Sequence, residues 1–361
     1  MAEEELEFAR GDLAGVMDKY SHLREWVDDF EKKHGVRPMY YGPLDRDASK
    51  INPLNLIYHL RGPLFAHVYA PPNDEEGGGS TLWFGIEPHL SEEEEIMKQI
   101  LIERLLKEAP NSPSFSSDSE FESMLKNMIK KHTKITNQVN SMNNLGDPIR
   151  QFLGFGEQPI GITTEQMERL EYTIIRDLVR SGPLEPLLSD EMLEDIHAVG
   201  LRYISMDHKV FGMVTSNIRF RDRDMLERYL RSMSERIGRP VSDSKPIIDG
   251  ALLDGSRINI IYSDDVSMLG SSFTIRKFAE ETISITQLIQ WGTLSAEVAA
   301  YIWLGLENGM SLLVSGETAS GKTTTLNAIL PFIDHNVKIY SAEDTPEVKV
   351  RHRLWQRLVT R

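Results

Sequence analysis

A short glycine-rich segment carries the clearest chemistry in this sequence. It follows the spacing G-x-x-x-x-G-K-[ST] and consists of Gly316, Glu317, Thr318, Ala319, Ser320, Gly321, Lys322 and Thr323. Glycine lets a backbone fold closely around a ligand, so that successive N–H groups converge on one small volume. The phosphate groups of a nucleotide need many such donors at once. We therefore predict that this loop binds a nucleoside triphosphate.

Three side chains at the end of the loop and the start of the helix after it are expected to take part in binding ATP and Mg²⁺. Lys322 can reach the β- and γ-phosphates as a point charge, while the helix that begins there offers the positive end of its dipole. Thr323 is predicted to ligate Mg²⁺ through its hydroxyl. Thr324 is assigned to the same nucleotide site. The alternative is a glycine-rich turn that binds nothing.

A second group of chemically active residues follows the apolar segment 337–342. If this segment is a parallel strand, its carboxyl end lies where ligands bind in open α/β sheets. Glu343 would then hold Mg²⁺ through a water molecule, and Glu343 or Glu347 would orient the attacking water. Thr345 and Pro346 also form a helix-start signature, so the two acids could instead complement a helix dipole. The sequence leaves both interpretations open.

The phosphate loop needs regular elements on both sides. Residues 311–315 are predicted to form a short buried strand before it, and residues 322–330 a helix that stops at Pro331. From Ser284 onward the pattern is helix, strand, loop, helix, strand, which is typical of an open parallel sheet. The C-terminal part is therefore expected to be an α/β domain.

The region before residue 281 mixes helices and strands. Residues 64–69 and 81–86 predict two strands, Ser91 with Glu94 predicts a capped helix start, and Thr164 is expected to cap a further helix. Composition changes place boundaries within the chain. The expected parts are an α+β partner-binding domain at 1–110, a linker and helix at 111–150, a middle α+β domain at 151–280 and the P-loop domain at 281–361.

Composition excludes several classes of site. The 361 residues include 40 Lys and Arg against 55 Asp and Glu, a net charge of −15, and no cysteine. Disulfides and thiolate metal sites are excluded, and the negative charge argues against a direct nucleic-acid partner. The most apolar stretch, 296–314, contains Glu297 and Glu307 and falls short of the ~20 apolar residues of a membrane span. Any membrane contact is expected to be peripheral.

Three groups of motifs resemble the type II/IV secretion ATPases, which drive type II secretion and the assembly of type IV pili and archaella. The first is the loop with its helix, in the segment 315–328, and the second is the acidic segment 342–347. The third lies in the middle region, at 193–197, 254–259 and 270–278. The segment 58–69 resembles the archaeal branch of the family.

This resemblance implies a fold and a set of partners. The α/β domain would be RecA-like, and the protein would be a homo-oligomer, expected to be a hexamer. It would be cytoplasmic, on the inner face of the cell membrane, docked on an integral membrane platform protein. Arg257 and Arg276 match family arginines that approach the phosphates, although a surface salt bridge is the alternative for each. The segment 343–347 matches the family's acidic box.

The family pattern also implies segments that this sequence does not contain. A Walker B segment and a histidine box would follow Arg361, so the P-loop domain is expected to be C-terminally incomplete. The function expected from the resemblance is an ATP-driven motor, or most of one, for secretion or filament assembly. The alternative is a non-hydrolysing, nucleotide-binding assembly or regulatory subunit of the same machinery.

Overall fold

A computed structural model describes most of the chain and divides it into two compact units. The described residues are 12–71, 80–108, 117–136, 159–252, 254–263, 265–277, 283–317, 320–343 and 347–360. Unit 1 comprises Met1–Leu193 and Tyr203–Arg219, and unit 2 comprises Glu194–Arg202 and Phe220–Arg361. The four-part division expected from the sequence stays a prediction.

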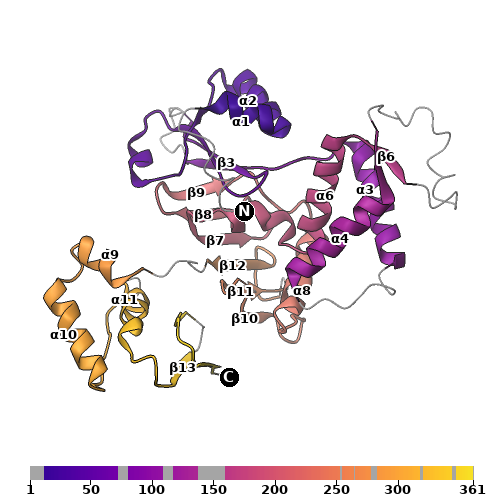
Figure 1. Ribbon diagram of the computed structural model, residues 1–361. Coiled ribbons are helices and arrows are strands. Elements are labelled where there is room, and N and C mark those ends of the chain that lie inside the picture. Colours follow the sequence, from indigo (N-terminus) through magenta and orange to yellow (C-terminus); the bar gives the residue numbers. More distant parts are fainter. Residues whose placement is uncertain are drawn as a thin grey trace. The chain divides into compact units, whose positions relative to one another are not determined.

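Unit 1 is built from helices and a mixed sheet (Figure 1). Its helices are α1 (Leu13–Lys19), α2 (Ser21–His34), η1 (Arg46–Lys50), α3 (Glu92–Glu108), α4 (Asp118–His132), α6 (Thr164–Leu178), η4 (Gly182–Leu184) and α7 (Glu185–Ser189). Its strands are β1 (Met39–Tyr40), β2 (Asn55–His59), β3 (Phe65–Tyr69), β4 (Leu82–Ile86), β5 (Thr133–Ile135), β6 (Ile160–Ile162), β8 (Ser205–His208) and β9 (Gly212–Ser216). Within the unit, the main sheet runs β1-β2-β3-β4-β9-β8, and β5 pairs with β6. The strands expected at 64–69 and 81–86 are confirmed as β3 and β4.

One apolar core cluster of unit 1 lies between α1, α2 and the first strands. Val16, Leu23 and Val27 from the helices pack in one cluster with Ile57 and Phe65 from the sheet, and all five are fully buried. Leu23 and Val27 lie four positions apart, on one face of α2, and Val16 comes from α1. Burial of these side chains holds α1 and α2 on the sheet.

A buried hydrogen-bond network ties the sheet of unit 1 to the segment after α7. The Tyr58 hydroxyl donates to Asp190 Oδ2 at 2.5 Å, and Trp83 Nε1 donates to the same oxygen at 3.0 Å. His208 Nδ1 accepts the backbone N–H of Val210 at 3.1 Å, so that Nε2, 3.1 Å from the Tyr58 hydroxyl, carries the proton of the neutral ring. Every polar group of the network is thus satisfied inside the fold.

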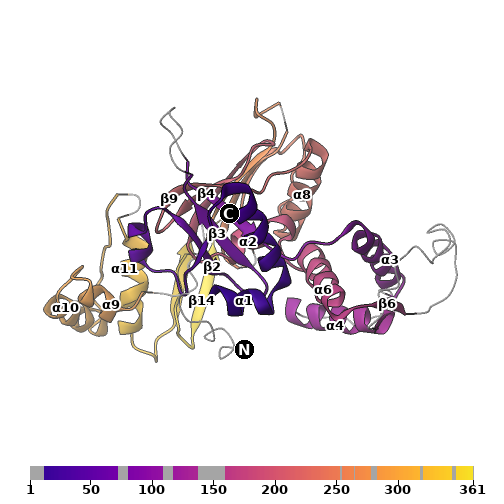
Figure 2. The same ribbon diagram turned by 90° about the horizontal axis from the view of Figure 1, so that it is seen from above.

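Helices α3, α4 and α6 form a helical layer (Figure 2). They share an apolar cluster that includes Leu101, Ile129 and Leu170. The helix start expected at Ser91 is confirmed, because Ser91 N–H donates to Glu94 at 2.8 Å and Glu94 N–H donates to the Ser91 hydroxyl. For α6 the cap is Thr163 rather than Thr164, since only Thr163 has a glutamine three positions later to complete the capping box.

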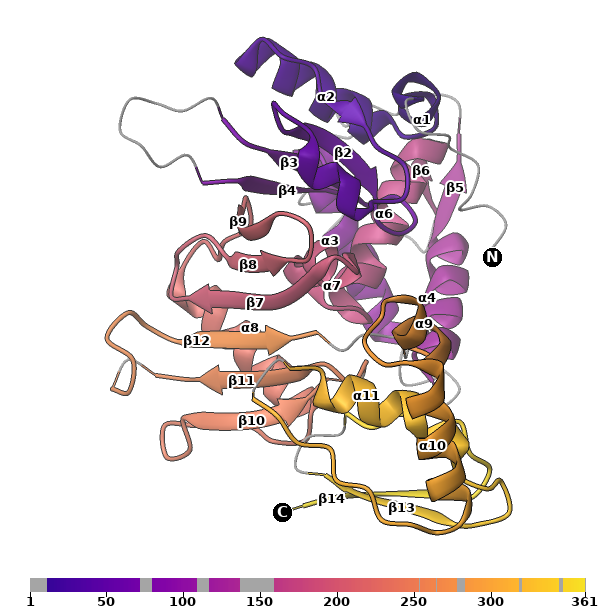
Figure 3. The ribbon, with the colours of Figure 1, turned by 90° about the vertical axis from the view of Figure 1, so that its left-hand side faces the viewer.

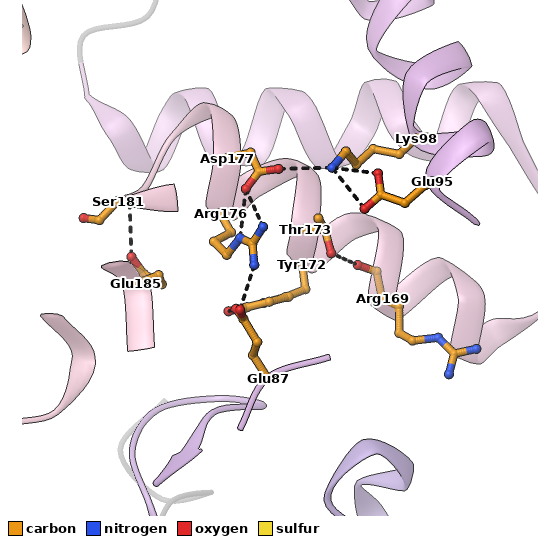
Figure 4. Close-up of polar contacts among 10 residues, drawn as sticks. All are labelled: Glu87, Glu95, Lys98, Arg169, Tyr172, Thr173, Arg176, Asp177, Ser181 and Glu185. Atoms are coloured by element: carbon orange, nitrogen blue, oxygen red, sulfur yellow. Dashed lines mark hydrogen bonds and ion pairs between the residues drawn. The ribbon is translucent and has the colours of Figure 1, made fainter. Parts of the chain in front are cut away.

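Ion pairs bind α6 to its neighbours (Figure 4). Arg176 lies 2.9 Å from Glu87, beyond the end of β4, and 2.8 Å from Asp177. Lys98 of α3 lies 3.3 Å from Asp177. The Tyr172 hydroxyl donates to Glu87 at 2.7 Å, and burial raises the pKa of this hydroxyl so that it stays protonated as a donor. Charged residues of α6 thus contact both α3 and Glu87, the residue after β4.

Unit 2 begins with an antiparallel sheet. Its strands β7 (Leu193–Val199), β12 (Ser272–Arg276), β11 (Arg257–Ile261) and β10 (Ile247–Ala251) pair in that order, and α8 (Arg223–Arg236) follows between β7 and β10 in sequence. Figure 3 shows β10, β11 and β12 side by side. Ile258, Phe273 and Ile275 are buried at alternate positions, as expected of strands with one face packed.

The glycine-rich loop lies in the last part of unit 2. The elements here are α9 (Ile285–Gln290), α10 (Ala296–Glu307), α11 (Lys322–Ile329), η5 (Leu330–Phe332), β13 (Ile339–Glu343) and β14 (Trp355–Val359). The predicted helix after the loop is confirmed as α11, and the predicted strand at 337–342 is confirmed as β13. β13 pairs in parallel with β14, which the sequence did not predict.

The strand predicted before the loop, at 311–315, is wrong for this structure. These residues have no regular secondary structure, and Leu312 and Leu313 are 47% and 87% exposed as whole residues. A strand needs a neighbouring backbone to bond, and no described strand pairs with this segment.

The elements as a whole bear out the mixed α/β class expected from the sequence. Both units combine helices with strands, and the parallel pair β13–β14 lies in the P-loop part. Among the described residues, no helix combines the length and the apolar composition that crossing a bilayer requires.

Candidate nucleotide-binding site

The glycine-rich loop leads directly into the N-terminus of α11. Gly321 is the N-cap and has φ +85°, in the left-handed region that glycine adopts without strain. An added Cβ on Gly316 would lie 2.5 Å from Ser320 Oγ, so the loop is closely folded there too. No side chain of the described residues caps α11, which leaves its first N–H groups able to donate to a ligand. Thr318 and Ala319 lie outside the described residues.

Lys322 contacts the loop itself. Its Nζ donates to the carbonyl oxygen of Glu317 at 2.5 Å. The ammonium group therefore lies over the loop, and its flexible stem lets it exchange this carbonyl for a phosphate oxygen. The geometry suits the phosphate-binding role predicted for Lys322.

Thr323, one residue further along α11, contacts the acidic segment. Its hydroxyl donates to Glu347 Oε2 at 3.0 Å. Two residues that the sequence assigned to one site are thus in direct contact, although 24 positions separate them. The lone pairs of the Thr323 oxygen stay available to a cation, because its hydrogen points to Glu347.

Glu343 at the end of β13 uses one of its carboxylate oxygens to hold the backbone. Oε2 accepts the N–H groups of Glu347 and Val348 at 2.6 and 2.7 Å. Oε1 is buried without a hydrogen-bond partner among the described residues, and Arg357 Nε lies 3.8 Å from it. Asp344, Thr345 and Pro346 lie outside the described residues, so the helix start expected there is not described.

The two predicted arginines lie opposite each other on neighbouring strands. Arg257 of β11 pairs in register with Arg276 of β12. Arg276 donates to both carboxylate oxygens of Asp195 at 3.0 Å, and this hydrogen-bonded carboxylate raises the pKa of Arg276. Arg257 lies 3.4 Å from Asp249, and both of these side chains are about half exposed. Each arginine therefore has a carboxylate partner in this structure.

A family model decides which class of protein these features belong to. The model of the type II/IV secretion system protein family matches residues 177–359, which include the loop, the acidic segment and both arginines. The chain belongs to this family. The family expected from the sequence motifs is thereby confirmed.

Relatives within the secretion-system family come from archaea and bacteria. The "Uncharacterized protein MJ0900" of Methanocaldococcus jannaschii is 45% identical over 354 residues, 98% of this chain and 63% of the relative. "Uncharacterized protein MJ0781" of the same organism is 32% identical over 60% of this chain and 30% of its own length. A "Putative conjugal transfer protein Rv3659c" of Mycobacterium tuberculosis is 28% identical over 51% of this chain and 54% of its own length. The chain spans less than two thirds of the length of these relatives.

Solved structures of secretion ATPases also align with the chain. The VirB11 ATPase of the Brucella suis type IV secretion system aligns with 49% of this chain and 59% of its own, at 20% identity and a TM-score of 0.28. The pilus retraction motor PilT, bound to ADP, aligns with 46% and 48%, at 17% identity and a TM-score of 0.33. At these TM-scores the likeness carries no conclusion, and the family membership rests on the family model.

For a member of the secretion-system family, the residues near Thr323 fit Mg²⁺. The cation prefers oxygen ligands in octahedral geometry, commonly with retained water. Thr323 offers a hydroxyl oxygen, and Glu343 offers Oε1, a carboxylate oxygen that is buried yet has no hydrogen-bond partner among the described residues. An unsatisfied carboxylate oxygen in a side chain that is only 10% exposed suits a bound cation or its water.

Sequence reasoning missed two residues of this site. Asn327 of α11 bonds to the backbone of the acidic segment at 3.2 and 2.9 Å. Arg357 of β14 lies beside Glu343. Asn327 follows Thr323 by four positions and so shares its helical face, which is the signal that could have identified it.

Proposed function

We propose that this chain is the ATP-binding part, and the larger portion, of a motor ATPase of the secretion-system family. Its RecA-like P-loop domain would bind MgATP and use hydrolysis to drive protein secretion or the assembly of a pilus-like or archaellum filament. The observation that carries the proposal is the uncapped N-terminus of α11 with Lys322 over the loop and Thr323 against Glu347.

The residues of the chain divide the work of binding. The first N–H groups of α11 donate to phosphate oxygens, and Lys322 exchanges its loop carbonyl for the β- and γ-phosphates. Thr323 would present its hydroxyl oxygen to Mg²⁺ while donating its hydroxyl hydrogen to Glu347, and Glu343 would hold Mg²⁺ through water. When bound, Mg²⁺ neutralises charge on the β- and γ-phosphates. Arg257 and Arg276 are proposed to exchange their carboxylate partners for the γ-phosphate during the cycle.

Calorimetric titration of the chain with MgATP tests the binding step. Lys322→Ala removes a charged donor, worth about 1.5–3 kcal/mol, so affinity should fall at least tenfold. Lys338→Ala is the matched control, since Lys338 lies in the same part of the chain, 4.6 Å over the Tyr340 ring. The proposal is wrong if wild-type protein releases no heat with MgATP or if both variants bind equally.

Phosphate release separates the motor from the alternative, a nucleotide-binding assembly or regulatory subunit without turnover. Wild-type chain is incubated with MgATP and inorganic phosphate is measured, with Lys322→Ala as the blank. Turnover that Lys322→Ala abolishes supports the motor ATPase. Binding without turnover is the result expected of the regulatory subunit, and also of a motor portion whose remaining catalytic residues lie outside this sequence.

The proposed setting is the cytoplasmic side of a membrane-bound machine. We propose a homo-oligomer, expected to be a hexamer, that docks on an integral membrane platform protein and touches the membrane only peripherally. The family membership and the conjugal-transfer relative support this setting. Light scattering with and without MgATP tests the ring: a sixfold mass supports it, and a monomer under both conditions contradicts it.

A further inference from the structure

We propose that Asn327 is a positioning residue for the metal ion of the nucleotide site, acting through Glu347. The inference rests on the proposed function, because it concerns the Mg²⁺ that accompanies ATP. Its basis is a set of contacts by which α11 holds residues 347–349, a segment with no regular secondary structure.

One face of α11 contacts Glu347 at two points. The Thr323 hydroxyl donates to the carboxylate of Glu347 at 3.0 Å, and Asn327 Nδ2 donates to its backbone carbonyl at 3.2 Å. Residues four apart on a helix lie one above the other, so the same face reaches both groups. The side chain and the main chain of Glu347 are thus fixed to a single rigid element.

The side-chain amide of Asn327 also bonds to the backbone of Lys349, two residues after Glu347. Lys349 N–H donates to Asn327 Oδ1 at 2.9 Å. The amide therefore uses a donor and an acceptor together on the backbone of one short segment, which fixes the orientation of its plane. A residue of similar size without this donor–acceptor pair could not make both bonds.

Glu343 holds the same segment from β13. Its Oε2 accepts the N–H groups of Glu347 and Val348 at 2.6 and 2.7 Å. Among the described residues, the side chains of Glu343 and Asn327 thus bond four backbone groups of residues 347–349. A segment held in this way moves when either side chain is lost, because no strand or helix ladder replaces the bonds.

The position of Glu347 sets the orientation of the Thr323 hydroxyl. A hydroxyl has one hydrogen, and giving it to Glu347 turns the lone pairs of the oxygen toward other directions, where a cation can bind. Mg²⁺ demands near-ideal octahedral geometry, so a displaced partner of its ligand lowers metal affinity. Asn327 touches neither metal nor nucleotide in this scheme and acts by keeping Glu347 in place.

The test separates metal binding from nucleotide binding. A fluorescent ATP analogue is titrated into the full chain twice, once with excess EDTA and once with saturating Mg²⁺. The Mg²⁺ gain is the factor by which Mg²⁺ raises the affinity for the analogue above its value in EDTA. For Asn327→Ala we expect an affinity within twofold of wild type in EDTA and a Mg²⁺ gain about tenfold smaller than that of wild type. Asn327→Asp should behave alike, because its carboxylate cannot donate to the Glu347 carbonyl.

A matched control and a ligand-free measurement complete the design. Asn336→Ala removes an amide that donates to Asp334 instead, and it should keep the full Mg²⁺ gain. In the ligand-free chain, hydrogen exchange at the Lys349 amide should accelerate at least fivefold in Asn327→Ala, while amides of α6 stay unchanged.

Each contrary result has a distinct meaning. If Asn327→Ala keeps the Mg²⁺ gain, or loses affinity equally in EDTA and in Mg²⁺, Asn327 is not a positioning residue for the metal. An unchanged Lys349 exchange rate overturns the proposed clamp. If wild type binds no analogue in either condition, the proposed function falls and this inference falls with it.

Discussion

At the scale of single residues, the conformation of Gly321 lets the chain pass from the loop into α11. Its φ of +85° costs a residue with a Cβ about 1–2 kcal/mol, although no described residue other than its chain neighbours has an atom within 4 Å of an added Cβ. Gly309 shares both properties, with φ +75°, at the end of α10. The pair therefore separates backbone strain from function.

We predict that Gly321→Ala and Gly309→Ala each lower the free energy of unfolding by about 1–2 kcal/mol. Only Gly321→Ala should weaken MgATP binding, because the first N–H groups of α11 would shift. Urea unfolding and calorimetric titration of both variants check this. Equal loss of affinity in the two variants would show that strain alone, wherever it lies, accounts for the effect.

Buried histidines are the second feature at this scale. Burial lowers the pKa of His208 to about 4 and that of His67 to about 3, from an ordinary 6.5. His208 faces Tyr58 and Asp190, and His67 accepts the Trp26 indole N–H. Between pH 6.5 and about 4, the unfolded chain takes up protons that the folded chain does not.

Stability should therefore be complete above pH 6.5 and fall as the pH drops, by up to about 1.4 kcal/mol per pH unit for each histidine. Urea unfolding at pH 7.5, 6.5 and 5.5 measures this slope. His208→Gln should make it shallower, while His89→Gln, at an exposed position, should not. A slope that His208→Gln leaves unaltered would contradict the assignment.

At the scale of elements, α6 depends on the charges at its C-terminal half. We predict that Arg176→Met destabilises the fold by about 1–3 kcal/mol, since Glu87 and Asp177 are only 15% and 28% exposed and lose their guanidinium partner. Adding Glu87→Gln should recover part of the loss. A double-mutant cycle by urea unfolding measures the coupling between Arg176 and Glu87. As a control, Lys131 pairs with Glu108 and its side chain is 66% exposed, so Lys131→Met should lower the free energy of unfolding by less than about 1 kcal/mol. A coupling near zero would be inconsistent with this account.

Elements also show where sequence reasoning succeeds. The phosphate loop, α11 and β13 were predictable because a glycine-rich turn and short apolar runs leave local signals. The segment 311–315 looked like a strand for the same reason, but strand formation depends on a partner that local sequence does not reveal. β14 was missed because Gln356 and Arg357 interrupt its apolar pattern.

The contacts of the candidate site lie further beyond local patterns. Glu343 was predicted as a metal-associated acid, yet its use of Oε2 to bind two N–H groups depends on where the tertiary fold places Glu347 and Val348. Asn327 meets Lys349 across 22 positions. Such pairings follow from tertiary folding. Residue types alone therefore suggested most residues of the candidate site, but not the hydrogen bonds between them.

At the scale of the whole molecule, the division into two units makes ligand stabilisation testable by region. A ligand that binds only the folded state adds about 2.7 kcal/mol at a concentration 100 times its Kd. We predict that MgATP at this ratio slows hydrogen exchange of α11 and β13, both in unit 2, up to about 100-fold. Helix α6 in unit 1 should be unaffected, and Lys322→Ala should show no protection anywhere. Equal protection of α6 would mean that the units unfold as one.

The contact between Lys322 and the Glu317 carbonyl has a consequence for selectivity. Its acceptor is a peptide oxygen, so no replacement of the Glu317 side chain can remove it. Any incoming molecule must compete with the protein's own main chain for this ammonium group. Adenosine carries no phosphate oxygen that could replace the Glu317 carbonyl as the acceptor for Lys322. The loop would therefore select triphosphates because their oxygens replace this carbonyl, and not because of their size.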